Sequence, residues 1–514
     1  MQQFLRTILN AKELSPKARR EKILPLATNS VISQTFNYIF AGKNSRELMR
    51  ALTDLSQDAQ KAEIIGHYID INAQKIPALM ESDDAKLKKS TAQLLGKLRP
   101  DEYAELLKES LLKEETQYVK PSLILALGNA KNTPWVLEFL NSYEITATEQ
   151  KHIEEQKAAL NKAVSSQKAD KLEYKMINPL PKGTKLLLTC PSVRVTQREV
   201  AALNYKTDIM SEQDNLLTVK GVEKYRRIFA ARSFYKAYIV FDLYKNVNEA
   251  VNAAASGMFT YFLRRLYGKG NLEYRLDIKS GDVSREDRKR LSVKLSERLD
   301  KQGFINSPSA YMFEITVMSV YRGAMLLIMP QAQLDDRFTY KKQGVSASIH
   351  PAAAAACVSF IAPYLKENAS VLDCFCGSGT MLFERARKPY GRLMGTDISK
   401  EALKAARLNE KFAKTGAHFY MKNALSPFED TFDEVISNLP FGLRVGSHMK
   451  NEGMYKGFLE NLRKLLKKDG YAFLFTHDKK LLAELIDASP FTLVCKHTFS
   501  CGGLYPSMFV IKKD

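Results

Sequence analysis

Apolar residues recur at helical spacing through the first third of the chain, where prolines and glycines are sparse and alternating β-branched runs are absent. This pattern predicts an all-helical region over residues 1–170. Residues 88–96 align with residues 120–128 at an offset of 32, and we expect Gly96 and Gly128 each to end a helix. A period near thirty favours stacked hairpins of the HEAT or armadillo type. An ordinary helical bundle is the alternative.

Residues 171–344 alternate short apolar runs with helical patterns, which indicates an α+β organisation. We expect two small α+β units in succession. In the first unit the expected strands are 185–190, 217–221 and 237–244, and the expected helices are 195–203 and 225–233. In the second unit the expected strands are 274–278, 310–317 and 325–329, and a basic helix covers 285–301.

The last third, residues 345–514, follows a strand-turn-helix order that is typical of a Rossmann-like sheet. Residues 371–380 (VLDCFCGSGT) predict a strand, a tight turn and a helix that begins at Thr380. Further strands are expected at 392–398, 432–436 and 471–475, and two antiparallel closing strands at 492–496 and 508–511. An amphipathic helix is expected at 455–467, with Gly470 as its stop.

The turn at Gly377, Ser378 and Gly379 is suited to a cofactor. Glycine lets the backbone pass close beneath a ligand, and the helix that follows points unpaired N–H groups at it. Asp397 ends the second strand, eighteen residues past Gly379, where an acid can accept hydrogen bonds from a ribose. The turn does not decide between a dinucleotide and S-adenosylmethionine, although Leu382 in place of a third glycine argues mildly against NAD.

Residues 437–442 (SNLPFG) follow the third strand and carry groups suited to an exocyclic amine. The Asn438 side chain and the Leu439 carbonyl can both accept hydrogen bonds from one NH₂ group, and Pro440 stiffens the turn. Phe441 offers a flat face for a base that has left its stack. Two acceptors that hold the amine hydrogens out of the ring plane would restore the nitrogen lone pair for attack on a sulfonium methyl. The turn by itself fits any exocyclic amine.

These motifs resemble those of the class I, S-adenosylmethionine-dependent amino-methyltransferases, and most of all the THUMP-domain guanine-N2 RNA methyltransferases. Residues 373–380 are similar to their D-P-x-C-G-S-G-T, GTDI (395–398) to their acidic second motif, and NLPFG (438–442) to their [DN]-[LP]-P-[FYW]-G. SASIHP (346–351) resembles their P-A-S-L-x-P segment. Two departures are Cys374 for a usual proline and Asn423-Ala424 for the commoner Asp-Ala.

The resemblance implies an enzyme that transfers a methyl group from S-adenosyl-L-methionine to N2 of a guanosine in tRNA, with acceptor-stem position 6 favoured over position 10. Asp373 would lie near the cofactor ammonium, Asp397 would hold the ribose and Asn423 the adenine. The cofactor residues would be Asp373, Cys376, Gly377, Ser378, Gly379, Thr380, Asp397, Ile398, Asn423, Ala424 and Asn438. The catalytic residues would be Asn438, Leu439, Pro440 and Phe441.

Three alternatives remain open: guanine-N2 methylation of ribosomal RNA, adenine-N6 methylation, and a catalytically silent RNA-binding scaffold. The middle third resembles the ferredoxin-like module and THUMP domain of the same family, through its order of elements and YRLDIKS (274–280). In that family THUMP holds the 3′ end of tRNA. The helical region 1–170 is expected to be a scaffold or a protein-contact surface.

The formal net charge of +20 is concentrated in the middle third. Residues 171–344 carry 30 lysines and arginines against 18 aspartates and glutamates, whereas residues 1–170 carry 24 against 22. Such an excess suits a phosphate backbone, although a merely basic surface would show it too. The candidate RNA contacts are Arg285, Arg288, Lys289, Arg322 and Arg444.

Several protein classes are not expected from this sequence. The most apolar stretch, residues 310–330, is interrupted by Glu314 and Arg322, so no membrane span is expected. The first ten residues lack the apolar centre of a signal peptide. The six cysteines show no disulfide framework or paired zinc spacing, and the seven histidines form no H-E-x-x-H. We therefore expect a cytoplasmic protein without a metal.

Overall fold

The computed structural model describes residues 1–11, 13–168, 176, 178–307, 311–321, 323–331, 335–345, 348–440 and 447–513. The chain divides into two compact units. The first unit consists of Met1–Lys175, Lys269–Leu276 and Ser296–Glu314, and the second of Met176–Gly268, Asp277–Leu295 and Ile315–Asp514. The division into three domains that the sequence suggests stays a prediction.

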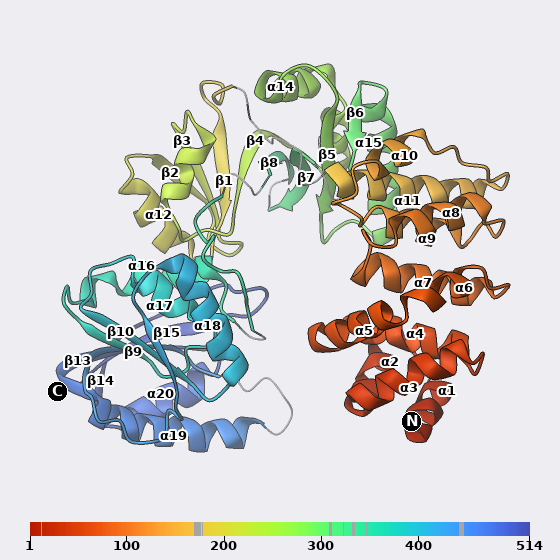
Figure 1. Cartoon of the computed structure of the whole chain (residues 1–514). Coiled ribbons are helices and arrows are strands. Elements are labelled where there is room, and N and C mark those ends of the chain that lie inside the picture. Colours follow the sequence, from red (N-terminus) through yellow and green to blue (C-terminus); the bar gives the residue numbers. More distant parts are fainter. Residues whose placement is uncertain are drawn as a thin grey trace. The chain divides into compact units, whose positions relative to one another are not determined.

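The described residues up to 168 form helices joined by short turns (Figure 1). The helices are α1 (Gln2–Asn10), α2 (Pro16–Ile23), α3 (Asn29–Phe40), α4 (Ser45–Leu55), α5 (Ala59–Ile71), α6 (Ile76–Met80), α7 (Ala85–Leu98), α8 (Ala104–Lys113), α9 (Lys120–Leu127), α10 (Val136–Ser142) and α11 (Gln150–Lys168). Leucine, isoleucine and phenylalanine side chains from successive helices share one core. The HEAT or armadillo resemblance and a protein partner for this region stay predictions.

The two glycines of the aligned segments allow helices to approach closely. Gly128 follows the last residue of α9, as expected, but Gly96 lies inside α7, so the prediction that it ends a helix is wrong. A Cβ at Gly96 would lie 2.4 Å from the Ala126 Cβ, and one at Gly128 would lie 2.5 Å from the Ala163 Cα. Both positions therefore require glycine because an alanine of a packed helix, Ala126 of α9 or Ala163 of α11, lies against them.

In the described part of the middle third, the strands of both expected units join in one eight-stranded sheet, with β1–β4 of the first unit together on one side and β5–β8 of the second together on the other. The strand order is β2-β3-β1-β4-β8-β7-β5-β6, and β4 pairs antiparallel with β8, which joins the two expected halves. The strands are β1 (Lys185–Thr189), β2 (Lys206–Ser211), β3 (Leu216–Lys220), β4 (Lys236–Tyr244), β5 (Leu272–Lys279), β6 (Phe304–Asn306), β7 (Phe313–Val320) and β8 (Gly323–Pro330). The helices are α12 (Val193–Ala201), α13 (Val247–Ala254), α14 (Gly257–Tyr267) and α15 (Arg285–Asp300).

The described part of the last third forms a seven-stranded sheet in the order β11-β10-β9-β12-β13-β15-β14. Strands β9 to β13 run parallel, and β15 runs antiparallel to β13 and β14, as expected of closing strands. The strands are β9 (Ser370–Asp373), β10 (Arg392–Asp397), β11 (His418–Met421), β12 (Phe432–Asn438), β13 (Leu466–Thr476), β14 (Phe491–Thr498) and β15 (Ser507–Lys513). The helices are α16 (Pro351–Ile361), α17 (Thr380–Arg385), α18 (Lys400–Ala413), α19 (Ser447–Leu465) and α20 (Lys479–Asp487).

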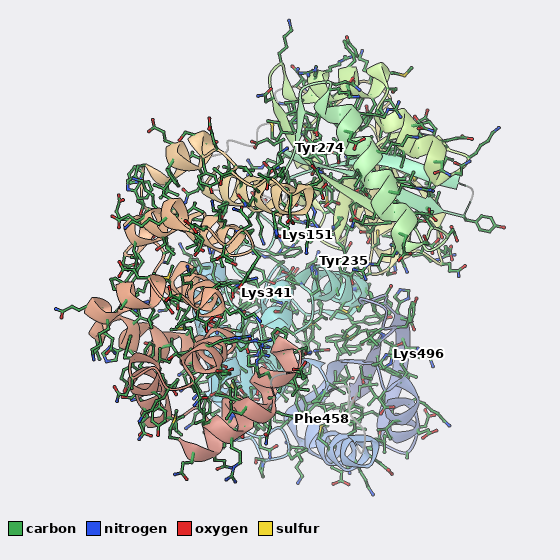
Figure 2. The ribbon with its side chains drawn as sticks, turned by 90° about the vertical axis from the view of Figure 1, so that its right-hand side faces the viewer. Lys151, Tyr235, Tyr274, Lys341, Phe458 and Lys496 are labelled. Atoms are coloured by element: carbon green, nitrogen blue, oxygen red, sulfur yellow. The ribbon has the colours of Figure 1, made fainter. Side chains whose placement is uncertain are left out.

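Helices cover both faces of this sheet (Figure 1). Helices α16, α17 and α18 contribute Ile361, Phe383 and Leu403 to the core on one face. Helices α19 and α20 contribute Phe458 and Leu482 to the core on the other face, and Phe458 can be followed in Figure 2. Parallel strands with both faces covered form a doubly wound sheet, whose ligand sites lie at the carboxyl ends of the strands.

Two local expectations for this sheet are corrected by the structure. Gly470 does not end the preceding helix: α19 ends at Leu465, and Gly470 lies inside β13, where a Cβ would lie 3.1 Å from the Asp433 carbonyl oxygen of the neighbouring strand. Strand β12 continues to Asn438 instead of ending at Ile436. Asn438 is therefore held by strand pairing, at the end of β12, and not by a free turn.

Within the second unit, buried polar contacts connect residues of the middle third to the last third. Arg232 donates from Nε and from its second terminal nitrogen to the two Glu384 oxygens, both at 2.9 Å, and Tyr340 donates to Glu384 at 2.8 Å. Tyr235, labelled in Figure 2, donates its hydroxyl to the Ser500 carbonyl at 2.7 Å. Because Glu384 lies on α17, the Arg232 and Tyr340 bonds hold the helix that follows the glycine turn.

Candidate active site

The ends of β9 and β12 lie side by side. The two strands pair in parallel, with Val435 opposite Leu372, so that Asp373 is level with Ile436 and Ser437 lies one residue further along. Ser437 donates its hydroxyl to Asp373 Oδ1 at 2.7 Å and accepts the Cys374 N–H at 3.0 Å. The glycine turn after β9 and the Asn438 end of β12 therefore meet at one place, as the sequence predicted.

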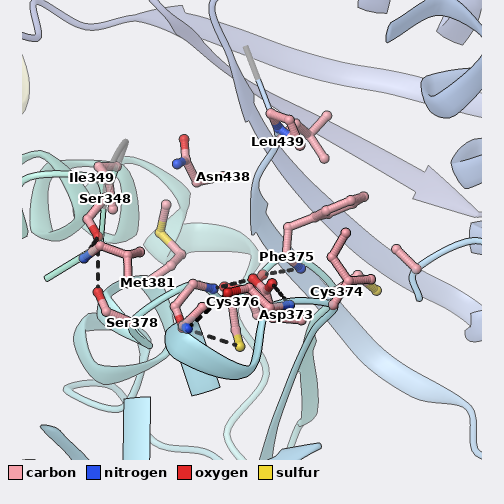
Figure 3. Close-up of a pocket in the computed structure, with 18 of the residues that line it drawn as sticks. Ser348, Ile349, Asp373, Cys374, Phe375, Cys376, Ser378, Met381, Asn438 and Leu439 are labelled. Atoms are coloured by element: carbon pink, nitrogen blue, oxygen red, sulfur yellow. Dashed lines mark hydrogen bonds between the residues drawn. The ribbon is translucent and has the colours of Figure 1, made fainter. Parts of the chain in front are cut away.

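A cavity of about 850 Å³ opens at this place, and Figure 3 shows residues of its lining. It brings together most of the predicted site, namely Asp373, Cys376, Gly377, Ser378, Thr380, Asp397, Ile398, Asn423, Ala424, Asn438, Leu439 and Pro440. Gly379 is not part of the lining, and Phe441 lies outside the described residues. The roles assigned to these residues stay predictions, but their convergence on one cavity is observed.

The turn after β9 has the backbone that glycine provides. Gly377 has φ of +52° and Gly379 has φ of +85°, in the left-handed region. A Cβ at Gly377 would meet only Val345 Cγ2, at 3.8 Å, so this backbone faces open space. A Cβ at Gly379 would lie 2.6 Å from the Phe383 ring. Gly377 thus exposes backbone to a ligand, whereas Gly379 permits the packing of α17 below it.

The carboxylate at the end of β10 is already fixed by the protein. Asp397 Oδ2 accepts the Gly377 N–H and Oδ1 accepts the Ser399 N–H, both at 2.9 Å. The acid therefore holds the glycine turn as well as lining the cavity, and its remaining lone pairs are available to ribose hydroxyls. Asn423 is fixed in a similar way, because its Oδ1 accepts the Leu425 N–H at 2.9 Å.

Asp373 is buried at the floor of the cavity, where it accepts hydrogen bonds from Ser437 and from the Phe375 N–H at 3.0 Å. Burial raises the pKa of Asp373 to about 7, although its two hydrogen bonds act in the opposite direction. An ammonium group next to Asp373 would favour the ionised carboxylate. This acid is therefore suited to a cationic part of a ligand.

Asn438, at the end of β12, has a side-chain oxygen that differs from those of Asp373, Asp397 and Asn423 in its hydrogen bonding. Asn438 lines the cavity, and its Oδ1 is buried and has no hydrogen-bond partner among the described residues. The segment that follows is held firmly: Leu439 donates its N–H to Phe475 O at 2.9 Å, and Tyr455 donates its hydroxyl to Pro440 O at 2.8 Å. A buried acceptor without a donor is costly, so this oxygen is suited to receive a donor from a ligand.

Sequence reasoning missed three sets of residues that support the site. Arg385 of α17 and Glu434 of β12 form a buried ion pair at 2.8 Å, which joins the helix after the glycine turn to strand β12. Asn409 of α18 bonds the Ser378 carbonyl, and Asn461 of α19 bonds the Ala424 carbonyl. A polar residue on the apolar face of an amphipathic helix was the available signal for both asparagines.

The predicted RNA contacts lie apart from the cavity lining or outside the described residues. Arg285, Arg288 and Lys289 lie in the first two turns of α15, where Arg285 and Lys289 are exposed and Arg288 is half-buried. None of the three lines the cavity. Arg322 and Arg444 lie outside the described residues. Binding of RNA by these side chains stays a prediction.

The described ranges contain no group of three or more histidine, cysteine, aspartate or glutamate side chains placed to hold a metal ion. No helix in the part of the chain that the structure describes is long and apolar enough to cross a membrane.

Residues 339–504 match the family model for the RMKL-like methyltransferase domain, UPF0020. Curated relatives match shorter stretches. The ribosomal protein L11 methyltransferase of Dictyoglomus thermophilum is 34% identical over 83 residues, 16% of this chain and 28% of that protein. The tRNA (guanine(6)-N2)-methyltransferase of Thermus thermophilus is 31% identical over 150 residues, 28% of this chain and 44% of that protein. The chain thus spans less than half the length of these two relatives.

Solved structures share the fold over a longer part of the chain. TrmN from Thermus thermophilus superposes with a TM-score of 0.52 and 19% identity, covering 64% of this chain and all of that chain. A possible methylase from Clostridium difficile 630 gives a TM-score of 0.51 and 19% identity, covering 64% and 98%. Since the methyltransferase match covers about a third of the chain, the shared fold extends beyond that match.

The cavity fits the cofactor of such domains. Glycine-turn backbone faces it, an acid ends the neighbouring strand, and Asp373 provides a buried carboxyl group. The match to a methyltransferase domain and this donor set support S-adenosyl-L-methionine as the cofactor of the C-terminal domain.

Proposed function

We propose that this chain is an S-adenosylmethionine-dependent RNA methyltransferase that modifies the exocyclic N2 of a guanosine in tRNA. The observation that carries the proposal is that Asn438, which lines the same cavity as the glycine turn, has a buried Oδ1 without a hydrogen-bond partner among the described residues. An exocyclic NH₂ is a donor that satisfies this oxygen. The tRNA guanine-N2 methyltransferase among the relatives supports guanine as the base.

In this proposal each residue of the cavity binds the part of the cofactor or of the target base that lies next to it. Asp397 binds the ribose, Asn423 the adenine, and Asp373 the ammonium of the methionine part, while Gly377 and Ser378 pass beneath it. The cofactor supplies an electrophilic methyl group. Asn438 and the Leu439 carbonyl accept the two hydrogens of the guanine amine, which directs the nitrogen lone pair at that methyl group. Phe441 stacks on the base. Positioning and fixed dipoles, rather than a strong base, supply the catalysis.

RNA is favoured as the substrate class by the charge of the middle third, which carries 30 basic against 18 acidic residues between 171 and 344. Helix α15 supplies Arg285, Arg288 and Lys289 as phosphate contacts. We expect the double variant Arg285→Ala/Lys289→Ala to weaken tRNA binding and to reduce its salt dependence. The matched control Lys17→Ala/Lys22→Ala removes two exposed charges from α2 and should leave tRNA binding unchanged.

The decisive experiment is nucleoside analysis by mass spectrometry after incubation of tRNA with the protein and labelled S-adenosylmethionine. We expect labelled N2-methylguanosine, and mapping of the modified nucleotide to position 6 of the acceptor stem, or to position 10. Ribosomal RNA is tested in parallel. Label in N6-methyladenosine, or in ribosomal RNA alone, would overturn the assignment of the substrate. Methyl transfer to an exocyclic amine would still stand as the reaction.

A second candidate substrate is ribosomal protein, because relatives named as ribosomal protein L11 methyltransferases match this chain. A protein amine would also donate to Asn438. Incubation with purified ribosomal protein L11 distinguishes the two, since our proposal expects no label there. Binding of tRNA without any methyl transfer to RNA or protein would favour the silent scaffold.

A further inference from the structure

We propose that Asn409 is a positioning residue for the methionine half of the cofactor. This inference rests on the proposed cofactor and deepens it. Asn409 lies on α18 and has no solvent exposure, and it does not line the cavity. It acts through the backbone of two segments that do.

All four hydrogen-bonding positions of the Asn409 amide are used. Its Oδ1 accepts the N–H groups of Lys342 and Gln343, both at 2.9 Å. Its Nδ2 donates to Gln343 O at 2.8 Å and to Ser378 O at 3.0 Å. One side chain thus joins the glycine turn to residues 342–343, which lead into the domain. Only a primary amide combines these two acceptor and two donor bonds at this size.

The two segments that Asn409 joins contact each other where both reach the lining of the cavity. Val345 donates its N–H to Ser348 Oγ at 3.0 Å. The Ser348 and Ser378 hydroxyls lie 3.2 Å apart, and Figure 3 marks the bond between these two residues with a dashed line. Val345 Cγ2 also lies 3.8 Å from the position of a Gly377 Cβ. The width of this end of the cavity therefore depends on the Asn409 bonds.

The order of strands assigns this end to the methionine part. The sheet runs β11-β10-β9-β12, so Asp397 and Asn423 lie after β10 and β11, on one side of β9, and Asn438 lies on the other. A cofactor with its ribose at Asp397 and its methyl group facing Asn438 must place its methionine carbons over the turn after β9. That turn contains Ser378, whose carbonyl Asn409 holds.

A second buried asparagine provides a matched comparison. Asn461 of α19 donates Nδ2 to Ala424 O at 2.7 Å and to Ser426 O at 2.9 Å. Ala424 and its neighbours line the adenosine end of the cavity. Asn409 and Asn461 therefore support opposite ends of the same site by the same chemistry.

The test measures binding of two ligands by isothermal titration calorimetry in the full chain. S-adenosylhomocysteine contains both halves of the cofactor, whereas 5′-methylthioadenosine lacks the amino-acid part. Asn409→Asp keeps the acceptor bonds and loses both donor bonds. We expect it to weaken S-adenosylhomocysteine about tenfold or more, and 5′-methylthioadenosine less than about threefold. Asn461→Asp should weaken both ligands by similar factors.

Equal weakening of the two ligands by Asn409→Asp would overturn the inference, because it would indicate general loss of structure. Unchanged binding of S-adenosylhomocysteine would overturn it as well. Asn409→Ala is made in parallel, with thermal unfolding of each variant, so that the ligand ratio is measured on a folded protein. Failure of the unaltered protein to bind S-adenosylhomocysteine would instead overturn the proposed function, and the inference with it.

Discussion

The two sides of the cavity differ in how the protein treats its own polar groups. On the cofactor side, after β9, β10 and β11, the acceptors of Asp373, Asp397 and Asn423 already receive hydrogen bonds from the protein. On the side that we propose to hold the methyl acceptor, called the acceptor side, Asn438 Oδ1 at the end of β12 is buried without a partner in the described structure. On the cofactor side the protein itself supplies hydrogen-bond donors to these oxygens. On the acceptor side no described donor reaches Asn438 Oδ1.

This difference indicates how binding and chemistry are separated. A pre-formed cofactor side binds without rearrangement, which lowers the cost of ordering. An unpaired buried acceptor costs about 1–3 kcal/mol, and an incoming amine removes that cost. The hydrogen bond from the amine to this acceptor therefore stabilises the bound methyl acceptor and does not contribute to binding of the cofactor. The comparison therefore predicts that variants on the two sides affect different measurements.

The largest expected effect comes from the acceptor side. Asn438→Ala removes the unpaired oxygen, and we expect methyl transfer to tRNA to fall by about a hundredfold to a thousandfold. Incorporation of label from S-adenosylmethionine measures it. Binding of S-adenosylhomocysteine and of tRNA should change less than about twofold, since the other contacts remain. If Asn438→Ala weakened binding of S-adenosylhomocysteine or tRNA as much as it reduced methyl transfer, the proposed separation of cofactor binding from methyl-acceptor positioning would be wrong.

The next effect comes from the cofactor side. Asp397→Asn leaves a side chain of the same size but replaces one of the two oxygens that accept the Gly377 and Ser399 N–H groups. We expect S-adenosylhomocysteine to bind about tenfold to a hundredfold more weakly by calorimetry. The control Asp430→Asn alters an exposed acid of the same domain and should leave binding unchanged. Binding by Asp397→Asn at full strength would contradict the ribose role.

A third prediction concerns pH on the cofactor side. Burial raises the pKa of Asp373 to about 7, so the carboxyl group is mostly protonated below that pH. To pair with a ligand ammonium at such a pH it must first release its proton, which weakens binding. We expect the affinity for S-adenosylhomocysteine to rise about tenfold between pH 6 and 8 and then to level off. 5′-Methylthioadenosine has no ammonium and should show no such rise. A flat profile for both ligands would separate Asp373 from the ammonium.

The same pKa has a consequence for stability without ligand. The folded protein binds the Asp373 proton more tightly than the unfolded chain does, because the pKa is raised from 3.8 to about 7. The contribution of Asp373 to the free energy of unfolding is therefore greatest below pH 4 and is lost as pH rises to 7. Asp373→Asn should reduce this fall with pH, as measured by urea unfolding at pH 5 and pH 8.

The smallest effect is expected from Tyr455→Phe. The hydroxyl of Tyr455 donates to Pro440 O and lies 2.7 Å from Thr476 Oγ1, so it holds the segment after Asn438. Its loss should cost about 1 kcal/mol of stability and reduce kcat a few-fold, while cofactor binding stays the same. The comparison Tyr390→Phe removes a buried hydroxyl bond to Thr415 O on the far side of the sheet and should leave kcat unchanged. A similar loss of kcat in both variants would indicate a general effect of stability.

The sequence alone determined the parts of this protein that depend on neighbours along the chain. Strand, glycine turn and helix at 371–380, the acid that ends β10, and the asparagine that ends β12 all have local patterns, because turn geometry and strand alternation are set by adjacent residues. The rule that parallel strands present their carboxyl ends together then placed these residues in one cavity. The helical character of residues 1–168 followed from periodicity in the same way.

Tertiary structure alone decided what depends on residues far apart in the chain. The pairing of β4 with β8 merged two expected units into one sheet, and the approach of Ala126, not a helix end, explains Gly96. Asn409 and Asn461 act on carbonyls more than thirty residues away, and only the packed structure shows that Asn438 Oδ1 is buried without a hydrogen-bond partner among the described residues. Hydrogen-bond partners and steric contacts of this kind have no local pattern, because they are set by how the elements pack.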